Sequence, residues 1–237
     1  MNSLALRSTW AEPDASAATG GLGKVTHGEQ LAWILAPRAL DPTHRHPLVV
    51  VLHGAGRQDE LLVRGLRDEP ERRRAIFVVP RSRQMTWDLI AGGDGDDLAF
   101  LGVVLDSLYR RFRIDRGRQG IIGFSDGASY GLAVGLSNPR IFSAVMGWAA
   151  GFVAIDAQNL HPDDPKPRVL LEHGTHDQLF AFDQVAVPIR DLLQKLGYPV
   201  EFRVDEGGIH WPRPTFASEA LDWFLGEPPV LADEQGR

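Results

Sequence analysis

Short apolar segments alternate with amphipathic segments along most of this chain. Residues 47–52 are apolar at every position, which is typical of a strand that is covered on both faces of a parallel sheet. Further strands are predicted at residues 31–35, 75–79, 120–123, 142–147, 168–172 and 200–204. Helices are predicted at residues 97–112, 128–136, 183–196 and 216–225. This alternation predicts an α/β fold, with a doubly wound, mostly parallel sheet and helices on both faces.

The length of the chain and the extent of the pattern indicate how it is organised. A chain of 237 residues can form one large domain or two small ones, and no linker or internal repeat divides the alternating pattern. We expect a flexible N-terminal arm over residues 1–24, a single domain over residues 25–226 and a flexible tail over residues 227–237. No insertion is large enough for a cap domain, so we expect an open site with a short overhanging loop at residues 86–95.

Charge and composition argue against several classes of partner. The net charge is −6, with 25 Lys and Arg residues against 31 Asp and Glu residues, whereas surfaces that bind nucleic acid or anionic lipid gather cations. No run approaches the 18 or so apolar residues needed to cross a bilayer, and residues 1–24 lack the apolar core of a signal peptide. We therefore expect a soluble, cytoplasmic protein without a nucleic-acid or membrane partner. Whether it pairs into a homodimer stays open.

The pentapeptide at residues 123–127 reads Gly-Phe-Ser-Asp-Gly and lies between a predicted strand and a predicted helix. In this strand–turn–helix setting, a G-x-S-x-G sequence holds its serine on a strained turn that pushes the hydroxyl out of the sheet. The two glycines are needed because a Cβ at either position would crowd the neighbouring strand and helix. The pattern predicts that Ser125 is a nucleophile.

A nucleophilic serine needs a base within hydrogen-bond reach, and the base needs a third group to orient it. Of the eight histidines, only His210 lies beyond the last predicted strand, in a loop bounded by glycine and proline. Asp177 follows a predicted strand, at the sheet edge where catalytic groups collect in open α/β sheets. We expect His210 to be the base and Asp177 to orient it, the plainer alternatives being a surface histidine and a helix cap. Asp183 and Asp205 are weaker candidates for the acid.

The reaction of a serine nucleophile also needs hydrogen-bond donors for the oxyanion that develops on the substrate. The sequence Leu-His-Gly-Ala-Gly at residues 52–56 follows a buried strand and forms a compact loop with free backbone amides. We expect one donor to be the amide of Asp126 and the second to be the amide of Ala55, with Gly56 as the near alternative. His53 is expected to brace this loop rather than to act as a base.

Aromatic residues and the remaining histidines offer further candidates. Three of the six tryptophans are candidate substrate contacts, Trp87, Trp148 and Trp211. Tryptophans are more often core or rim residues, and Trp211 is singled out because it adjoins His210. Two closely spaced histidine pairs invite a metal interpretation, His44/His46 and His173/His176. The sequence suggests no third ligand for either pair, and cysteine ligands are excluded because the chain has no cysteine. We expect no metal and no cofactor.

Together these motifs resemble the α/β-hydrolase superfamily, most of all its phospholipase/carboxylesterase-like branch, which is similar to the polyhydroxybutyrate-depolymerase-type esterases. The matching pieces are Leu52-His53-Gly54, the pentapeptide at residues 123–127, His173-Gly174-x-x-Asp177 and the Gly-Gly-Ile-His sequence at residues 207–210. The resemblance covers residues 25–225 and implies the chain order serine, acid, histidine. The roles that it implies are Ser125 as nucleophile, His210 as base and acid, Asp177 as orienting group, and Ala55 and Asp126 as oxyanion donors.

The chain departs from that branch at the residue after the nucleophile, which is commonly Gln or Asn and here is Asp126. Its amide is unaffected, but its carboxylate disfavours anionic substrates. The resemblance implies a cofactor-free serine hydrolase that cleaves a small-molecule carboxylic ester of short to medium acyl chain through an acyl-enzyme. A thioesterase or acyltransferase with the same triad, a non-catalytic binding module and a peptidase stay open as alternatives.

Overall fold

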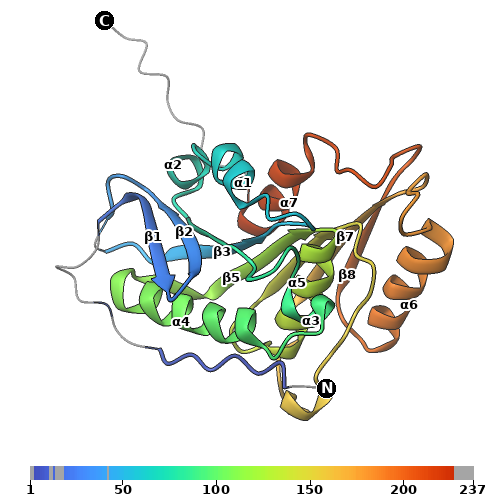
Figure 1. Cartoon of the computed structure of the whole chain (residues 1–237), viewed down its shortest axis with the longest axis horizontal. Helices are drawn as coiled ribbons and strands as arrows, with labels where there is room; N and C mark the ends of the chain where they lie inside the picture. The colour runs from blue at the N-terminus through green and yellow to red at the C-terminus, as the bar shows by residue number, and fades with distance from the viewer. Residues whose placement is uncertain (1–2, 11–12, 14–18, 42, 227–237) are drawn as a thin grey trace, which may run out of the picture.

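A single eight-stranded sheet runs through the molecule in the order β1-β2-β4-β3-β5-β6-β7-β8, and Figure 1 gives the computed structural model of the chain. The structure describes residues 3–10, 13, 19–41 and 43–226. Its strands are β1 (Gly21–His27), β2 (Gln30–Ala36), β3 (His46–Leu52), β4 (Ile76–Pro80), β5 (Ile114–Phe124), β6 (Ala144–Trp148), β7 (Arg168–Gly174) and β8 (Val200–Asp205). Among these strands β2 alone runs against the others. The predicted doubly wound, mostly parallel sheet is therefore confirmed.

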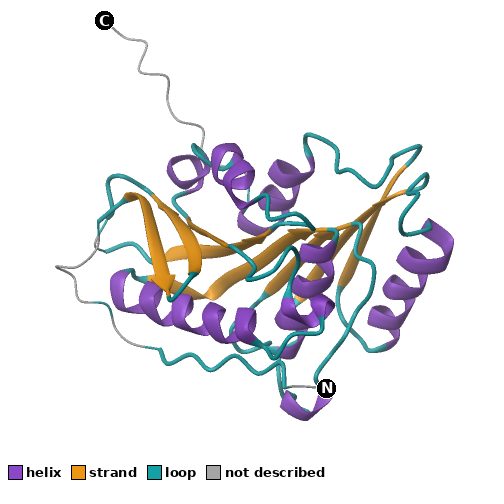
Figure 2. Ribbon diagram, in the orientation of Figure 1, coloured by secondary structure: helices purple, strands orange, loops and turns teal. Residues whose placement is uncertain are grey.

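Helices cover both faces of the sheet (Figure 2). They are α1 (Asp59–Gly65), α2 (Glu69–Arg73), α3 (Asp88–Ala91), α4 (Asp96–Arg111), α5 (Asp126–Ser137), α6 (Val187–Lys195) and α7 (Phe216–Leu225), with a short 3₁₀ turn, η1 (Ala157–Asn159), and a π-helical turn before α6, η2 (Phe182–Ala186). Side chains of α4, α5 and α6 belong to the buried clusters on one face, and side chains of α1 and α7 belong to the cluster on the other. Among the described residues, no helix is both long and apolar enough to cross a lipid bilayer.

Strand β3 shows why an unbroken apolar run marks the centre of such a sheet. Successive side chains of a strand point to opposite faces. Leu48 and Val50 accordingly join the cluster that includes α4, while Val49 and Val51 join the cluster that includes α7. Because both faces are covered by helices, β3 has no position at which a polar side chain would reach water.

The N-terminal region is more closely attached to the domain than a loose arm would be. Strand β1 begins at Gly21, before the predicted domain boundary at residue 25. Leu4 is buried, and its amide donates a 2.9 Å hydrogen bond to the Asp156 carboxylate. The Leu6 amide donates to the Asn138 side chain at 2.8 Å. The predicted tail over residues 227–237 lies outside the described residues, and the division into arm, domain and tail stays a prediction.

The expectation of an overhanging loop at residues 86–95 is corrected in part. The segment contains α3, and two buried carboxylates tie it to the start of α4. The Asp97 amide donates to the Asp88 carboxylate at 2.7 Å, and the Asp88 amide donates to the Asp97 carboxylate at 2.9 Å. Burial, with the Asp88 carboxylate close by, raises the pKa of Asp97 to about 6. These reciprocal hydrogen bonds hold the segment against the body of the protein.

Candidate active site

The turn between β5 and α5 places Ser125 in a backbone conformation that few non-glycine residues adopt, with φ 54° and ψ −117°. Such strain is retained where the surrounding structure enforces it. A Cβ added to Gly123 would lie 2.3 Å from the Gly127 carbonyl oxygen, and one added to Gly127 would lie 2.5 Å from the Leu52 and His53 carbonyl oxygens. Both contacts are closer than real Cβ atoms allow. The two glycines therefore permit the turn for the reason that the sequence pattern predicted.

The structure brings Ser125, His210 and Asp177 together at the carboxyl ends of three parallel strands. His210 Nε2 lies 2.9 Å from Ser125 Oγ, and His210 Nδ1 lies 2.8 Å from Asp177 Oδ2. A carboxylate can only accept a hydrogen bond, so Nδ1 carries the proton of the neutral ring and Nε2 is left to accept the serine hydroxyl. This is the tautomer that a general base opposite a serine requires.

Asp177 is held as an ion in a buried position. Its side chain is 0% exposed, and Oδ1 accepts hydrogen bonds of 2.8 Å from the amides of both Leu179 and Phe180. Burial by itself raises the pKa of Asp177, but the hydrogen bonds from the Phe180 amide, the His210 ring and the Leu179 amide outweigh it and leave the pKa below its ordinary value. The carboxylate is therefore charged at neutral pH.

The other acids considered for this role lie elsewhere. Asp183 is in the π-helical turn η2 and Asp205 is the last residue of β8, and the described hydrogen bonds join neither side chain to His210. Of the three candidate acids, Asp177 alone is paired with the imidazole.

A second imidazole shares the Asp177 carboxylate, which sequence reasoning did not anticipate. His173 Nε2 lies 3.2 Å from Asp177 Oδ2 and 2.8 Å from the Phe180 carbonyl oxygen. Both partners are acceptors, so this nitrogen carries the proton, and burial lowers the pKa of His173 and keeps the ring neutral. His173 thus supports Asp177 and is not available to a metal through Nε2. In the part of the chain that the structure describes, no group of three acidic or histidine side chains could hold a metal ion.

The loop that carries His210 is fastened to the sheet on both sides of the histidine. The Trp148 indole donates to the His210 carbonyl oxygen at 2.9 Å, and the His176 amide donates to the Gly208 carbonyl oxygen at 2.8 Å. Three residues beyond the histidine, Arg213 Nε donates to Glu172 Oε1 at 2.6 Å. These contacts fix the backbone on which the imidazole is mounted.

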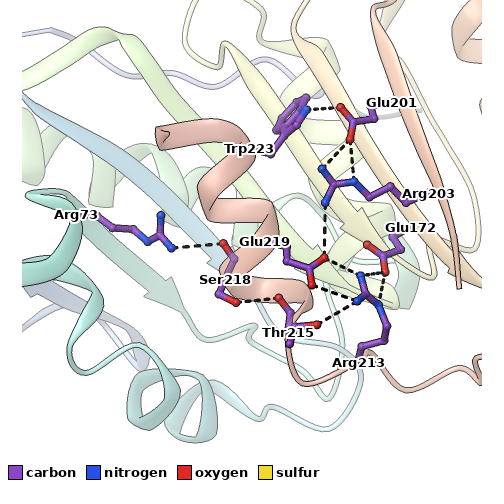
Figure 3. A network of polar contacts seen from close by, with 9 residues as sticks. All are labelled: Arg73, Glu172, Glu201, Arg203, Arg213, Thr215, Ser218, Glu219 and Trp223. Atoms are coloured by element: carbon purple, nitrogen blue, oxygen red, sulfur yellow. Dashed lines mark hydrogen bonds and ion pairs between the residues drawn. The ribbon is translucent and has the colours of Figure 1, made fainter. Parts of the chain in front are cut away.

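Arg213 is the centre of a network of charges between the sheet and α7 (Figure 3). It joins Glu172 at the end of β7 to Glu219 on α7. Arg203 of β8 lies 3.9 Å from the same Glu219 carboxylate and also pairs with Glu201. The Glu172 side chain is 1% exposed, and burial raises its pKa even though Arg213 opposes the shift. The network ties β7, β8 and α7 together beside the histidine loop.

Two of the three tryptophans proposed as substrate contacts are core residues, which corrects that prediction. Trp87 is 2% exposed and Trp148 is fully buried. Each indole N–H is satisfied by a backbone carbonyl, that of His53 for Trp87 and that of His210 for Trp148. Trp211 is 57% exposed. Of the three, it alone remains a candidate to touch a substrate.

His53 controls the direction of one of the two expected oxyanion donors. Its Nε2 accepts a 3.1 Å hydrogen bond from the Ser82 amide, so Nδ1 carries the proton and donates to the Gly54 carbonyl oxygen at 2.6 Å. Burial lowers the pKa of His53 and keeps the ring neutral. In the trans peptide that joins Gly54 to Ala55, the N–H points opposite to the C=O. By holding that carbonyl, His53 turns the Ala55 amide to the other side.

The near alternative for this donor, Gly56, is wrong. Its amide already donates to the Met85 carbonyl oxygen at 2.7 Å, which leaves no hydrogen for an oxyanion. The described hydrogen bonds do not include one from the Ala55 amide. The Asp126 amide is at the first position of α5, where a helix supplies no acceptor of its own. The Ala55 and Asp126 amides are therefore the two that remain available.

Exposed apolar side chains lie on the loops that carry Asp177 and His210 and on the segment that follows β4. Met85, Leu179, Ile209 and Trp211 are each more than half exposed. The last two flank His210, and the Trp211 ring packs edge-on against Phe124, with their centroids 5.1 Å apart.

Comparison with known proteins finds esterases that are similar to this chain. No protein-family model matches it. Feruloyl esterase C of Emericella nidulans is 27% identical over 173 residues, which are 70% of this chain and 60% of that enzyme. This chain therefore spans about 60% of the length of the curated relative that it matches.

Solved structures extend the comparison. A ferulic acid esterase of Anaeromyces mucronatus superposes with a TM-score of 0.66 and 16% identity, over 94% of this chain and 98% of that one. The acyl-protein thioesterase 2 of Zea mays gives a TM-score of 0.61 and 16% identity, over 81% of this chain and 96% of that one. The chain has the α/β-hydrolase fold of these enzymes. The resemblance drawn from the sequence motifs is confirmed at the level of the fold.

Proposed function

We propose that this chain is a serine hydrolase that cleaves uncharged carboxylic esters of short to medium acyl chain through an acyl-enzyme. The observation that carries the proposal is the continuous hydrogen-bond path from Asp177 through His210 to Ser125, with contacts of 2.8 and 2.9 Å. A hydroxyl, an imidazole and a buried carboxylate in this order form a complete nucleophile, base and orienting group.

The geometry assigns a role to each group in the reaction. Ser125 Oγ attacks the ester carbonyl carbon while His210 Nε2 takes the hydroxyl proton, and Asp177 stabilises the imidazolium that results. The Ala55 and Asp126 amides donate to the oxyanion. His210 then passes the proton to the leaving alcohol, and the serine is left acylated. Water attacks the acyl-enzyme with His210 again as base, which releases the acid and restores the hydroxyl.

The surroundings of the site support a neutral ester with an apolar part. The exposed side chains of Leu179, Ile209 and Trp211 lie on the loops that carry Asp177 and His210. The exposed side chain of Met85 lies on a segment that is bonded to the Ala55 loop. Such exposed apolar area favours the burial of apolar groups of a ligand. The carboxylate of Asp126, next to the nucleophile, repels an anionic substrate. The names of the esterase relatives support ester cleavage as the reaction class.

A thioesterase that uses the same triad is the second candidate, and the likeness to the Zea mays acyl-protein thioesterase 2 favours it over acyl transfer. Paired oxygen and sulfur esters of one acyl group separate the two functions, since the acyl-enzyme is the same and only the leaving group differs. An oxygen ester that turns over with a kcat/KM equal to or above that of its thioester supports the esterase. The cytoplasmic location expected from the sequence stays a prediction.

The test is reaction of Ser125 with a fluorophosphonate probe together with turnover of esters graded by acyl length. We expect the wild-type chain to be labelled and to cleave short and medium esters, and Ser125→Ala to do neither. We expect Asp177→Ala and His210→Ala to lose at least a thousandfold in kcat, as removal of a triad member does elsewhere. Equal labelling of wild type and Ser125→Ala, or no turnover of any ester, would reject the proposal in favour of a binding module.

A further inference from the structure

The two expected oxyanion donors lie on different segments, and a third segment is bonded to both. Residues 82–87 follow β4, just as the Ala55 loop follows β3 and Asp126 follows β5. These three strands run parallel to one another, so the segments that follow them meet at one edge of the sheet. The 82–87 segment therefore lies beside both donors without supplying either of them.

Five hydrogen bonds join the 82–87 segment to the Ala55 loop. They run from Ser82 N to His53 Nε2 (3.1 Å), Arg57 Nε to Ser82 O (3.1 Å), Arg57 Nη2 to Arg83 O (2.8 Å), Gly56 N to Met85 O (2.7 Å) and Trp87 Nε1 to His53 O (2.9 Å). Two of them involve His53, which precedes Ala55, and three involve Gly56 and Arg57, which follow it. Because the bonds are spread over the length of both segments, the two segments form one unit.

A single side-chain hydrogen bond connects this unit to the nucleophile turn. Thr86 Oγ1 lies 2.5 Å from Asp126 Oδ2, and the described hydrogen bonds include no other between residues 82–87 and residues 124–127. The carboxylate can only accept, so the threonine hydroxyl donates. A hydrogen bond to an ionised group is shorter and stronger than one between neutral groups. Both side chains are half-buried, which limits competition from water.

We infer that the Thr86–Asp126 hydrogen bond sets the separation of the Ala55 and Asp126 amides, and that Thr86 is a positioning residue for the oxyanion hole. This inference rests on the proposed function. The Asp126 carboxylate is anchored to the same Cα as its amide, so restraining one restrains the other. Both amides must lie about 2.7–3.1 Å from one oxygen atom, and errors of about half an ångström are enough to weaken such a site.

The test compares Thr86→Val, which keeps the shape but loses the hydroxyl, with Thr86→Ser, which keeps the hydroxyl. For Thr86→Val we expect kcat on an uncharged ester to fall about tenfold, a fraction of the hundredfold or more that loss of a whole oxyanion donor causes, with KM within about twofold. Thr86→Ser retains most of kcat. Thr26→Val, the same substitution at an exposed position on β1, is the matched control and keeps wild-type kinetics.

A double-mutant cycle and a transition-state analogue separate positioning from a merely structural role. Asp126→Ala is expected to match Thr86→Val, and the double variant is expected to lose no more than either single variant, because both remove the same bond. The affinity for a trifluoromethyl ketone, which forms a tetrahedral oxyanion with Ser125, falls in parallel with kcat/KM. The affinity for the product acid does not change.

The outcomes distinguish the inference from the proposed function. A wild-type chain that neither reacts with the fluorophosphonate nor cleaves an ester overturns the proposed function and this inference with it. An active wild type whose Thr86→Val variant keeps the wild-type kcat overturns the inference alone. Thr86→Val that raises KM, lowers the melting temperature and is not rescued by serine also overturns it, since that pattern reports a general loosening of the loop.

Discussion

Replacing Arg213 by methionine tests how the loop that carries the imidazole is held. Methionine keeps an unbranched side chain but removes the charge. In the wild type, Glu172 Oε1 accepts from Arg213 at 2.6 Å, and Glu172 Oε2 has no hydrogen-bond partner among the described residues. The substitution therefore leaves the buried Glu172 carboxylate without its cation. It does so three residues beyond His210, because that is the position of Arg213 in the chain.

The burial of the two partners sets the size of the effect. Breaking a fully buried ion pair costs about 3–5 kcal/mol. The Glu172 side chain is 1% exposed but that of Arg213 is 32% exposed, so solvent screens part of the interaction. We expect Arg213→Met to lower the free energy of unfolding by about 2 kcal/mol, which lowers the melting temperature of a chain of this size by about 4–8 °C.

The loss of stability must also depend on pH in a defined direction. Burial already raises the pKa of Glu172, and without Arg213 the pKa rises further. An acid whose pKa is higher in the folded state costs no stability while it is protonated in both states. The cost appears as the pH rises above the unfolded pKa, and it is complete above the folded pKa. The deficit of Arg213→Met is therefore larger at pH 8 than at pH 4.

Urea unfolding of four proteins at both pH values decides the matter. They are the wild type, Arg213→Met, Glu172→Gln and the double variant. In the Glu172→Gln background no buried carboxylate is left without a cation. There, Arg213→Met should lower the free energy of unfolding by less than half of what it does in the wild type. A deficit that is equal in both backgrounds, or the same at both pH values, refutes the reasoning.

Three further predictions follow from other contacts. Trp148→Phe removes the indole donor to the His210 carbonyl oxygen and should lower kcat about fivefold, the effect of about 1 kcal/mol, with KM unchanged in steady-state assays; an unchanged kcat contradicts the anchoring role. The pKa of Asp97 is raised to about 6, so the wild type should lose stability as the pH rises from about 4 to about 6. Urea midpoints measured across that range should show this loss for the wild type and not for Asp97→Asn. Midpoints that fall equally with pH in both proteins would contradict the prediction. Gly127→Ala places a Cβ 2.5 Å from two backbone carbonyl oxygens and should cost more than about 3 kcal/mol by urea unfolding; wild-type stability and turnover would show that the turn tolerates a side chain.

The arrangement of the three candidate catalytic groups is predictable because it depends on local patterns. Ser125, Asp177 and His210 each follow a segment whose apolar character marks it as a strand, and parallel strands bring their carboxyl ends to one edge. Neither the strand pattern nor the shared edge of parallel strands depends on knowing which side chains are in contact. The three residues therefore lie together in the structure, as the strand pattern predicts.

Other features depend on contacts between distant segments, and these were missed. Whether Trp87 lies in the core or in a pocket depends on the carbonyl that its indole reaches, which belongs to His53 in another segment. The Gly56 amide is engaged only because the Met85 carbonyl oxygen lies beside it. Helices α1, α2 and α3 have 7, 5 and 4 residues, too few for a helical period to stand out. Strand β1 contains two glycines, and among the described strands it pairs only with β2, so its sequence signal is weak.

The position of β8 has a consequence for how the proposed activity would be lost on heating. Among the described strands, β8 is the last of the sheet and pairs with β7 alone. The segment that carries the imidazole begins at its end. The nucleophile, in contrast, follows β5 in the middle of the sheet. Outer strands open at a lower free energy than inner ones. We therefore expect β8 and the loop that carries His210 to detach from the sheet first on heating. Turnover should be lost at a lower temperature than that of the main unfolding transition, in which the rest of the sheet melts as a unit.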